Sequence, residues 1–204
     1  MTDPRVELAI QLFEDAYQMQ MQGELDVAMD LYKKSITIHP TAEAYTFLGW
    51  AYRFQGRLDD AILECKHAIE IDPTFGNPYN DIGAYLIEKG QVDDAIPWLE
   101  KATKSVRYDS YHFPWYNLGR AYVTKEMLKQ AQDCFQQAVD IEPDYSMAKQ
   151  ALERVRRMIQ PCITLPSKLF QVRSSVRPGL LAASRPSLTL VRRAGPPPDA
   201  SDSR

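Results

Sequence analysis

The chain has 204 residues, of which 45% are hydrophobic and 25% are charged, and its formal net charge is −3. No apolar run is long enough to cross a bilayer, the first residues do not resemble a secretory signal, and the three cysteines show no paired spacing. We therefore expect a soluble, cytoplasmic protein without a disulfide framework or a zinc site.

Small and aromatic residues recur along the chain with a period of about 34 residues, which is typical of stacked helix pairs. The alanines that mark the same position of each copy are Ala28, Ala61, Ala95 and Ala131. The predicted repeats lie near residues 9–41, 42–75, 76–111 and 112–145. Because such helix pairs bury their core against their neighbours, the sequence predicts an all-α solenoid of about four repeats.

Turn residues divide each predicted repeat into two helices. Asp3 and Pro4 form a favourable start for the first helix. Gly23, Gly56 and Gly90 fall at the turns within the first three repeats, where positive φ is required. The fourth repeat has Glu126 instead, so its turn has less conformational freedom or a different geometry. Glycines inside the first helices, at positions 49, 83 and 119, predict close helix approach.

The third predicted repeat departs from the pattern. Pro97 lies inside its second helix, where it should loosen one backbone hydrogen bond. The repeat lacks the proline that ends the others, and the next repeat begins late. The intervening stretch, residues 108–115, is rich in aromatic residues, and we expect it to be exposed. This stretch supports an alternative function, in which the chain is a self-assembling or structural subunit of a larger complex.

Residues 146–159 carry one apolar stripe and one polar face, which predicts a capping helix at the end of the array. The array is thus expected over residues 3–159. Residues 160–204 hold half of the chain's 14 prolines together with many serines and arginines, and we expect them to form a disordered, basic tail. The preceding part of the chain is acidic. This charge balance argues against nucleic-acid binding by the repeats.

The fourth copy reads Trp115-x2-Leu118-Gly119-x2-Tyr122, followed by Ala131-x3-Phe135 and Pro143. The copies that begin at Tyr45 and Tyr79 repeat most of these offsets. This pattern resembles the tetratricopeptide repeat family over roughly residues 3–159. The resemblance implies a right-handed superhelix whose first helices line a concave groove, and a role as a scaffold that binds segments of other proteins.

One face of each first helix is predicted to be free for a partner, because the signature positions, including Tyr45, Tyr79 and Trp115, belong to the core. The candidate partner-binding residues are Phe13, Tyr17, Trp50, Arg53, Asn77, Asn80, Tyr116 and Arg120. Aromatic rings and amides suit a peptide with apolar side chains and a hydrogen-bonded backbone. For Asn80 and Asn117 the alternative is a bridge between adjacent helices.

A chaperone-binding subclass of this family uses lysine, asparagine and arginine to hold a terminal carboxylate. The corresponding places here hold Phe13, Tyr17, Phe47, Asn77 and Asp81, or, one repeat later, Thr46, Trp50, Asp81, Phe113 and Asn117. Neither register supplies the cations. Carboxylate-clamp binding is therefore disfavoured.

No catalytic or metal-binding motif is visible. His39, His67 and His112 lie in different repeats, and the paired aspartates at 59–60 and 93–94 suit helix N-termini. The sequence thus predicts a non-catalytic adaptor with no cofactor, no metal and no small-molecule substrate. Its partner is expected to be a protein or peptide.

Overall fold

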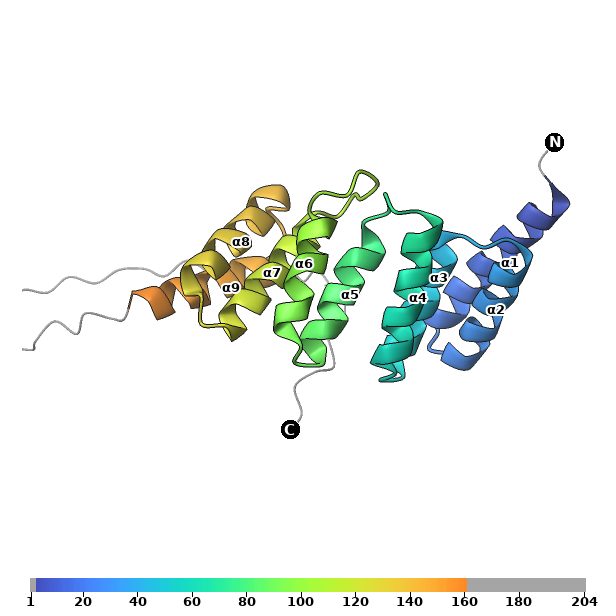
Figure 1. Ribbon diagram of the computed structural model, residues 1–204, viewed down its shortest axis with the longest axis horizontal. Helices are drawn as coiled ribbons and strands as arrows, with labels where there is room; N and C mark the ends of the chain where they lie inside the picture. The colour runs from blue at the N-terminus through green and yellow to red at the C-terminus, as the bar shows by residue number, and fades with distance from the viewer. Residues whose placement is uncertain (1–2, 161–204) are drawn as a thin grey trace, which may run out of the picture. The chain divides into compact units, whose positions relative to one another are not determined.

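The computed structural model describes residues 3–160 (Figure 1). Residues 1–2 and 161–204 are not described, so the predicted basic tail lies outside this range. Nine helices occupy the described residues: α1 (Pro4–Met21), α2 (Leu25–Ile38), α3 (Ala42–Phe54), α4 (Leu58–Ile71), α5 (Asn77–Glu88), α6 (Val92–Ala102), α7 (His112–Thr124), α8 (Leu128–Ile141) and α9 (Ser146–Ile159). The all-α prediction is confirmed. None of these helices combines the length and the apolar character that a bilayer crossing needs.

Consecutive helices pack as the pairs α1/α2, α3/α4, α5/α6 and α7/α8, and α9 packs on α8 (Figure 1). The first helices also contact one another, α1 with α3, α3 with α5 and α5 with α7. The second helices make no comparable contacts with each other. The face shared by α3, α5 and α7 is therefore the inner side of the stack, which we call the groove.

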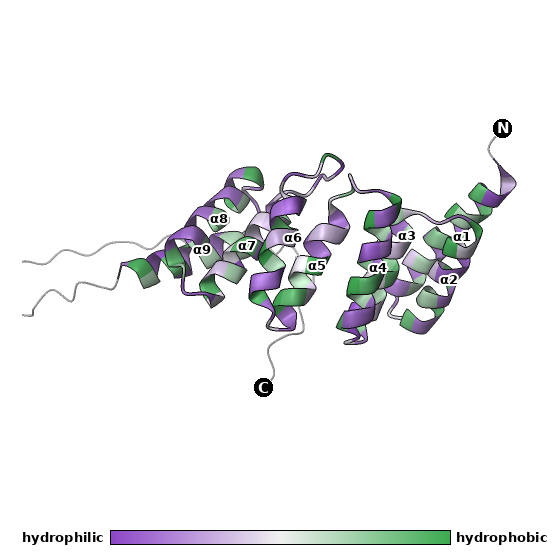
Figure 2. Cartoon of the chain, in the orientation of Figure 1, coloured by the Kyte–Doolittle hydropathy of each residue, from purple (hydrophilic) through white to green (hydrophobic). Residues whose placement is uncertain are grey.

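Each helix carries both hydrophilic and hydrophobic residues, as expected of helices that bury one side (Figure 2). The recurring alanines Ala28, Ala61, Ala95 and Ala131 are completely buried. Gly119 lies against Phe135 so closely that a Cβ at position 119 would stand 2.5 Å from a ring carbon. The predicted close approach of the two helices in a repeat is confirmed there.

The turn inside the fourth repeat is left-handed although it has no glycine. Glu126 has a φ of 58°, close to the 74° of Gly56 and the 76° of Gly90. The turn thus keeps the geometry of the other repeats. A side chain in this conformation is strained by roughly 1 kcal/mol or more.

The signature aromatics are less uniformly buried than predicted. Tyr79 is buried, whereas Tyr45 and Trp115 are only half-buried. Cys65, which replaces the usual aromatic in α4, is completely buried, and this burial raises the pKa of its thiol well above the usual range. A buried thiol with a raised pKa is a poor nucleophile, because the reactive form is the thiolate.

The connection between α6 and α7 corrects the expectation of an exposed aromatic stretch. Tyr108 is 6% exposed and lies against Gly76, where a Cβ would stand 2.5 Å from the tyrosine side chain. The guanidinium of Arg107 donates to Glu43 at 2.6 Å and to Asp72 at 2.9 Å. The longer connection therefore folds back on the preceding repeats, although Phe113, in the first turn of α7, is 40% exposed.

A polar contact recurs between successive repeats. The residue just after a first helix reaches an aspartate in the first turn of the preceding second helix, and the pairs are Gln55–Asp26, Lys89–Asp59 and Lys125–Asp93. The paired aspartates of α4 and α6 therefore serve the stacking of the repeats as well as the helix dipole.

Candidate functional site

A pocket of about 470 Å³ opens in the groove between α3, α5 and α7; we call it the central pocket. Five of the eight candidate residues line it: Trp50, Arg53, Asn77, Asn80 and Arg120. It is also lined by Phe47, Asp81, Tyr85, Tyr108 and Phe113, among others. Residues from three successive repeats thus meet at one place.

A chain of hydrogen bonds crosses this pocket from α7 to α5. Arg120 donates to Oδ1 of Asn117 at 3.1 Å, and Asn117 donates to Oδ1 of Asn80 at 3.0 Å. Asn80 in turn donates to Asp81 at 3.3 Å. Asn80 and Asn117 are buried, so the expected alternative, a bridge between adjacent helices, is what their amides form.

Two acidic residues, Glu88 and Asp81, line the central pocket. Glu88 forms an ion pair with Arg53, with a nitrogen–oxygen distance of 2.7 Å. Burial raises the pKa of Asp81 to about 7, against the opposing effects of the Asn80 hydrogen bond and the charge of Arg53. One helical turn further on, Tyr85 is 3% exposed, and its buried hydroxyl has no hydrogen-bond partner among the described residues.

Phe13 and Tyr17 lie outside the central pocket, at the α1 end of the groove. Their rings meet that of Phe47 edge-on, with centroid distances of 5.3 and 5.6 Å, and Phe47 contacts Trp50 at 5.8 Å. Tyr17 is 37% exposed, whereas Phe13 is half-buried and also lines a separate apolar pocket beside Ala9 and Ile10. The aromatic residues thus extend the groove towards α1.

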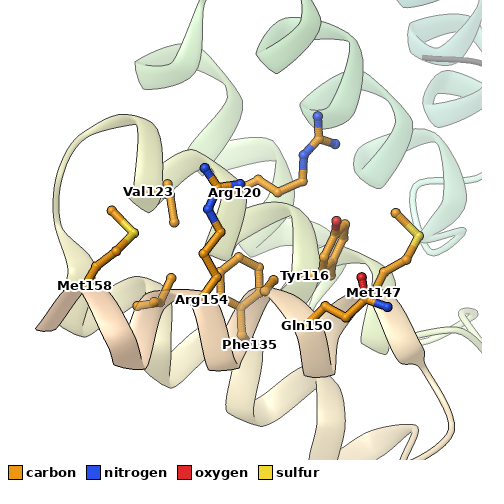
Figure 3. A pocket seen from close by; sticks show the side chains of 10 residues that line it. Tyr116, Arg120, Val123, Phe135, Met147, Gln150, Arg154 and Met158 are labelled. Carbon is orange, nitrogen blue, oxygen red and sulfur yellow. The ribbon is translucent and has the colours of Figure 1, made fainter. Parts of the chain in front are cut away.

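The remaining candidate, Tyr116, lies at a second pocket, of about 430 Å³, between α7 and α9 (Figure 3). We call it the C-terminal pocket. Tyr116 lines it, and Arg120 lines both pockets. The other lining residues include Val123, Met147, Gln150, Arg154 and Met158. Four of these five come from α9.

These α9 residues were not among the predicted binding residues, because the sequence pattern indicated only a capping role for this helix. Their spacing could have indicated a shared surface, since positions 147, 150, 154 and 158 lie on one side of a helix. Asp81 and Tyr85 were also missed as groove residues. Asp81 appeared only as a mismatch to the carboxylate clamp, and nothing local marks the burial of either side chain.

The histidines of the described residues do not gather at one site. Between residues 3 and 160, no three histidine, cysteine, aspartate or glutamate side chains are grouped to hold a metal ion. His67 approaches Glu64 at 3.2 Å, while His112 packs against Phe113 and Tyr145. These histidines serve local packing.

Comparison with known proteins agrees with this architecture. Three family profiles, each described as Tetratricopeptide repeat, match residues 42–75, 64–96 and 114–145. The chain is 29% identical over 105 residues to small glutamine-rich tetratricopeptide repeat-containing protein 2 of Mycosarcoma maydis, a match that covers 50% of this chain and 30% of that protein. The chain thus spans less than a third of the length of this relative.

Solved structures show the same fold. The chain superposes on PilF of Pseudomonas aeruginosa with a TM-score of 0.73 at 18% identity, over 78% of this chain and 72% of that one. It superposes on YrrB, described as a TPR protein with an unusual peptide-binding site, with a TM-score of 0.59 at 20% identity, over 71% and 74% of the two chains. The recurring motif, the stacked helix pairs and the three profile matches lead to one assignment: the chain is a tetratricopeptide repeat protein.

Proposed function

We propose that this protein is a non-catalytic adaptor that binds an extended segment of another protein in the groove between α3, α5 and α7. The observation that carries the proposal is the central pocket, where side chains from three repeats surround a space of about 470 Å³. Pockets that combine aromatic walls with a few polar groups are typical binding sites.

The chemistry of the pocket suits a peptide. Trp50 and Phe47 offer aromatic surface for apolar side chains, and Asn77 offers an amide for the backbone. The buried hydroxyl of Tyr85 has no partner among the described residues, and a buried polar group of this kind costs about 1–3 kcal/mol. A peptide group that entered the pocket would supply the missing hydrogen bond.

The geometry does not suit a carboxylate clamp. None of the corresponding positions carries a lysine or an arginine in either register, and the acid Asp81 lines the groove. YrrB, whose fold is shared, is described as having an unusual peptide-binding site. This likeness supports peptide binding in general, and the partner proposed here is a protein segment without a required terminal carboxylate.

Affinity purification from native lysate, with mass spectrometry, tests the proposal on the full chain. Trp50→Ala combined with Asn77→Ala removes one aromatic wall and one amide of the pocket. Leu63→Ala is the control, because Leu63 is 49% exposed on α4, away from the lining of the central pocket. We expect a specific protein to be lost with the double variant and retained with the control. Equal recovery by both variants, with unchanged circular dichroism, would place the function on another surface.

A further inference from the structure

Two arginines line the C-terminal pocket. Arg120 is on α7 and Arg154 is on α9, and Figure 3 shows the Arg154 side chain extending from α9 towards Arg120. Neither forms an ion pair with a carboxylate of residues 3–160; Arg120 instead donates to the neutral amide of Asn117. Two positive charges are thus held at one pocket without acidic partners from the described part of the chain.

The neighbouring basic residues of α9 do not line the C-terminal pocket. Arg156 donates to the side chain of Gln136 at 2.8 Å, and Arg157 lies 3.8 Å from Glu153 on the same helix. No aspartate or glutamate is among the residues that line the C-terminal pocket. The central pocket, by contrast, contains Asp81 and the Arg53–Glu88 ion pair. Among residues 3–160, Arg120 and Arg154 thus line the C-terminal pocket without an acidic partner.

Apart from Gln150, the rest of the C-terminal pocket is lined mainly by apolar and aromatic residues. Met147 is 45% exposed and Met158 is 48% exposed, and Val123 and Tyr116 line the pocket between them. Methionine side chains fill irregular spaces and accommodate different apolar groups. A partner that places an anion between the arginines would therefore meet apolar surface directly beside it.

We infer that the C-terminal pocket binds an acidic side chain together with an adjacent bulky apolar side chain of the partner segment. The inference rests on the proposed function and assigns the partner's chemistry. Because Arg120 lines both pockets, a segment that occupies the central pocket continues past Arg120 into the C-terminal pocket. The carboxylate is thus that of an aspartate or glutamate within the segment and is not the chain terminus.

The probe is a displayed library of random peptides of about twelve residues, selected on the full chain. We expect the wild type to enrich peptides with aspartate or glutamate beside leucine, methionine or phenylalanine. Arg154→Glu should remove the acidic preference, whereas Trp50→Ala should weaken binding and leave that preference unchanged. Peptides enriched without acidic residues, or an acidic preference that survives Arg154→Glu, would overturn the inference and leave the proposed function intact. No enrichment on the wild type would overturn both.

Fluorescence anisotropy on a selected, C-terminally amidated peptide then measures the contact directly. Replacing its glutamate with glutamine should weaken binding to the wild type by about tenfold, the effect of losing one charge-assisted hydrogen bond, and by less than about twofold in Arg154→Gln. Arg156→Gln is the matched control on the same helix and should keep the tenfold difference. A peptide that binds only with a free terminal carboxylate would overturn the assignment of an internal acid.

Discussion

Asn117 on α7 donates a hydrogen bond of 3.0 Å to Asn80 on α5, and both side chains are buried in the groove. This pair also connects to Arg120 on one side and to Asp81 on the other. The hydrogen bond therefore holds two repeats together, and Asn80, Asp81 and Arg120 of this network line the central pocket.

Removing one amide of this pair should destabilise the array. Asn117→Ala leaves the buried Oδ1 of Asn80 without its donor, and we expect the free energy of unfolding to fall by about 1–3 kcal/mol. Urea unfolding followed by circular dichroism measures the change, and Gln137→Ala on the exposed face of α8 is the control. Asn80→Ala/Asn117→Ala should lose less than the sum of the single variants. A loss below about 0.5 kcal/mol for Asn117→Ala would contradict this role.

The strained turn at Glu126 predicts a stabilising substitution. Glycine adopts a φ of 58° without steric cost, so Glu126→Gly should raise the free energy of unfolding by about 0.5–1 kcal/mol after the entropy of glycine in the unfolded chain is deducted. Gly90→Ala, at the equivalent turn of the preceding repeat, should instead lower it by about 1 kcal/mol. Denaturation of both variants under the same conditions tests the pair. Destabilisation by Glu126→Gly would show that its side chain has a contact that outweighs the strain.

The raised pKa of Asp81 predicts a pH-dependent stability. Since the folded state holds this proton up to about pH 7 and the unfolded chain releases it near pH 4, the folded state binds more protons between these values. The contribution of Asp81 to stability therefore decreases as pH rises from about 4 to about 7, by at most about 1.4 kcal/mol per pH unit.

Asp81→Asn removes this titration and keeps the shape of the side chain. We expect the variant to gain stability relative to the wild type as pH increases from 5 to 8, which urea unfolding at several pH values would reveal. Asp94→Asn, on an exposed position of α6, is the control and should follow the wild-type curve. Parallel curves for Asp81→Asn and the wild type would mean that Asp81 titrates normally in the folded protein.

The aromatic residues of the α6–α7 connection should differ in their effect on stability. Tyr108→Ala removes a buried ring that packs on Gly76, and we expect a loss of about 3 kcal/mol or more. Phe113→Ala removes a ring that is 40% exposed and should cost much less. Thermal or urea unfolding distinguishes the two. Equal, small losses would show that the connection does not contribute to the folded core.

Self-association can be tested on the same surface. Because Tyr108 is turned inwards, we expect light scattering on the full chain to give one molecular mass at all concentrations. A mass that increases with concentration, and that Phe113→Ser reduces, would instead support the structural-subunit alternative. Leu63→Ser, on the exposed face of α4, controls for a general effect of removing surface hydrophobicity.

Much of the fold follows from local sequence. The alanine and glycine positions, the turn glycines and the prolines each act over a single repeat, so the recurring pattern was sufficient to predict the helices and their stacking. Five of the eight candidate residues meet at the central pocket for the same reason, because residues at equivalent positions of successive first helices face one side.

Other features depend on residues that are far apart in the sequence and meet only in the folded chain. The burial of Tyr108 requires the space above Gly76, and the raised pKa of Asp81 requires the surrounding helices to exclude water. The presence of Arg120 and Arg154 at one pocket requires α9 to pack against the end of the array. The repeat pattern of the sequence determined the array and its groove, whereas tertiary packing decided which charges are buried, which are paired and which remain available to a partner.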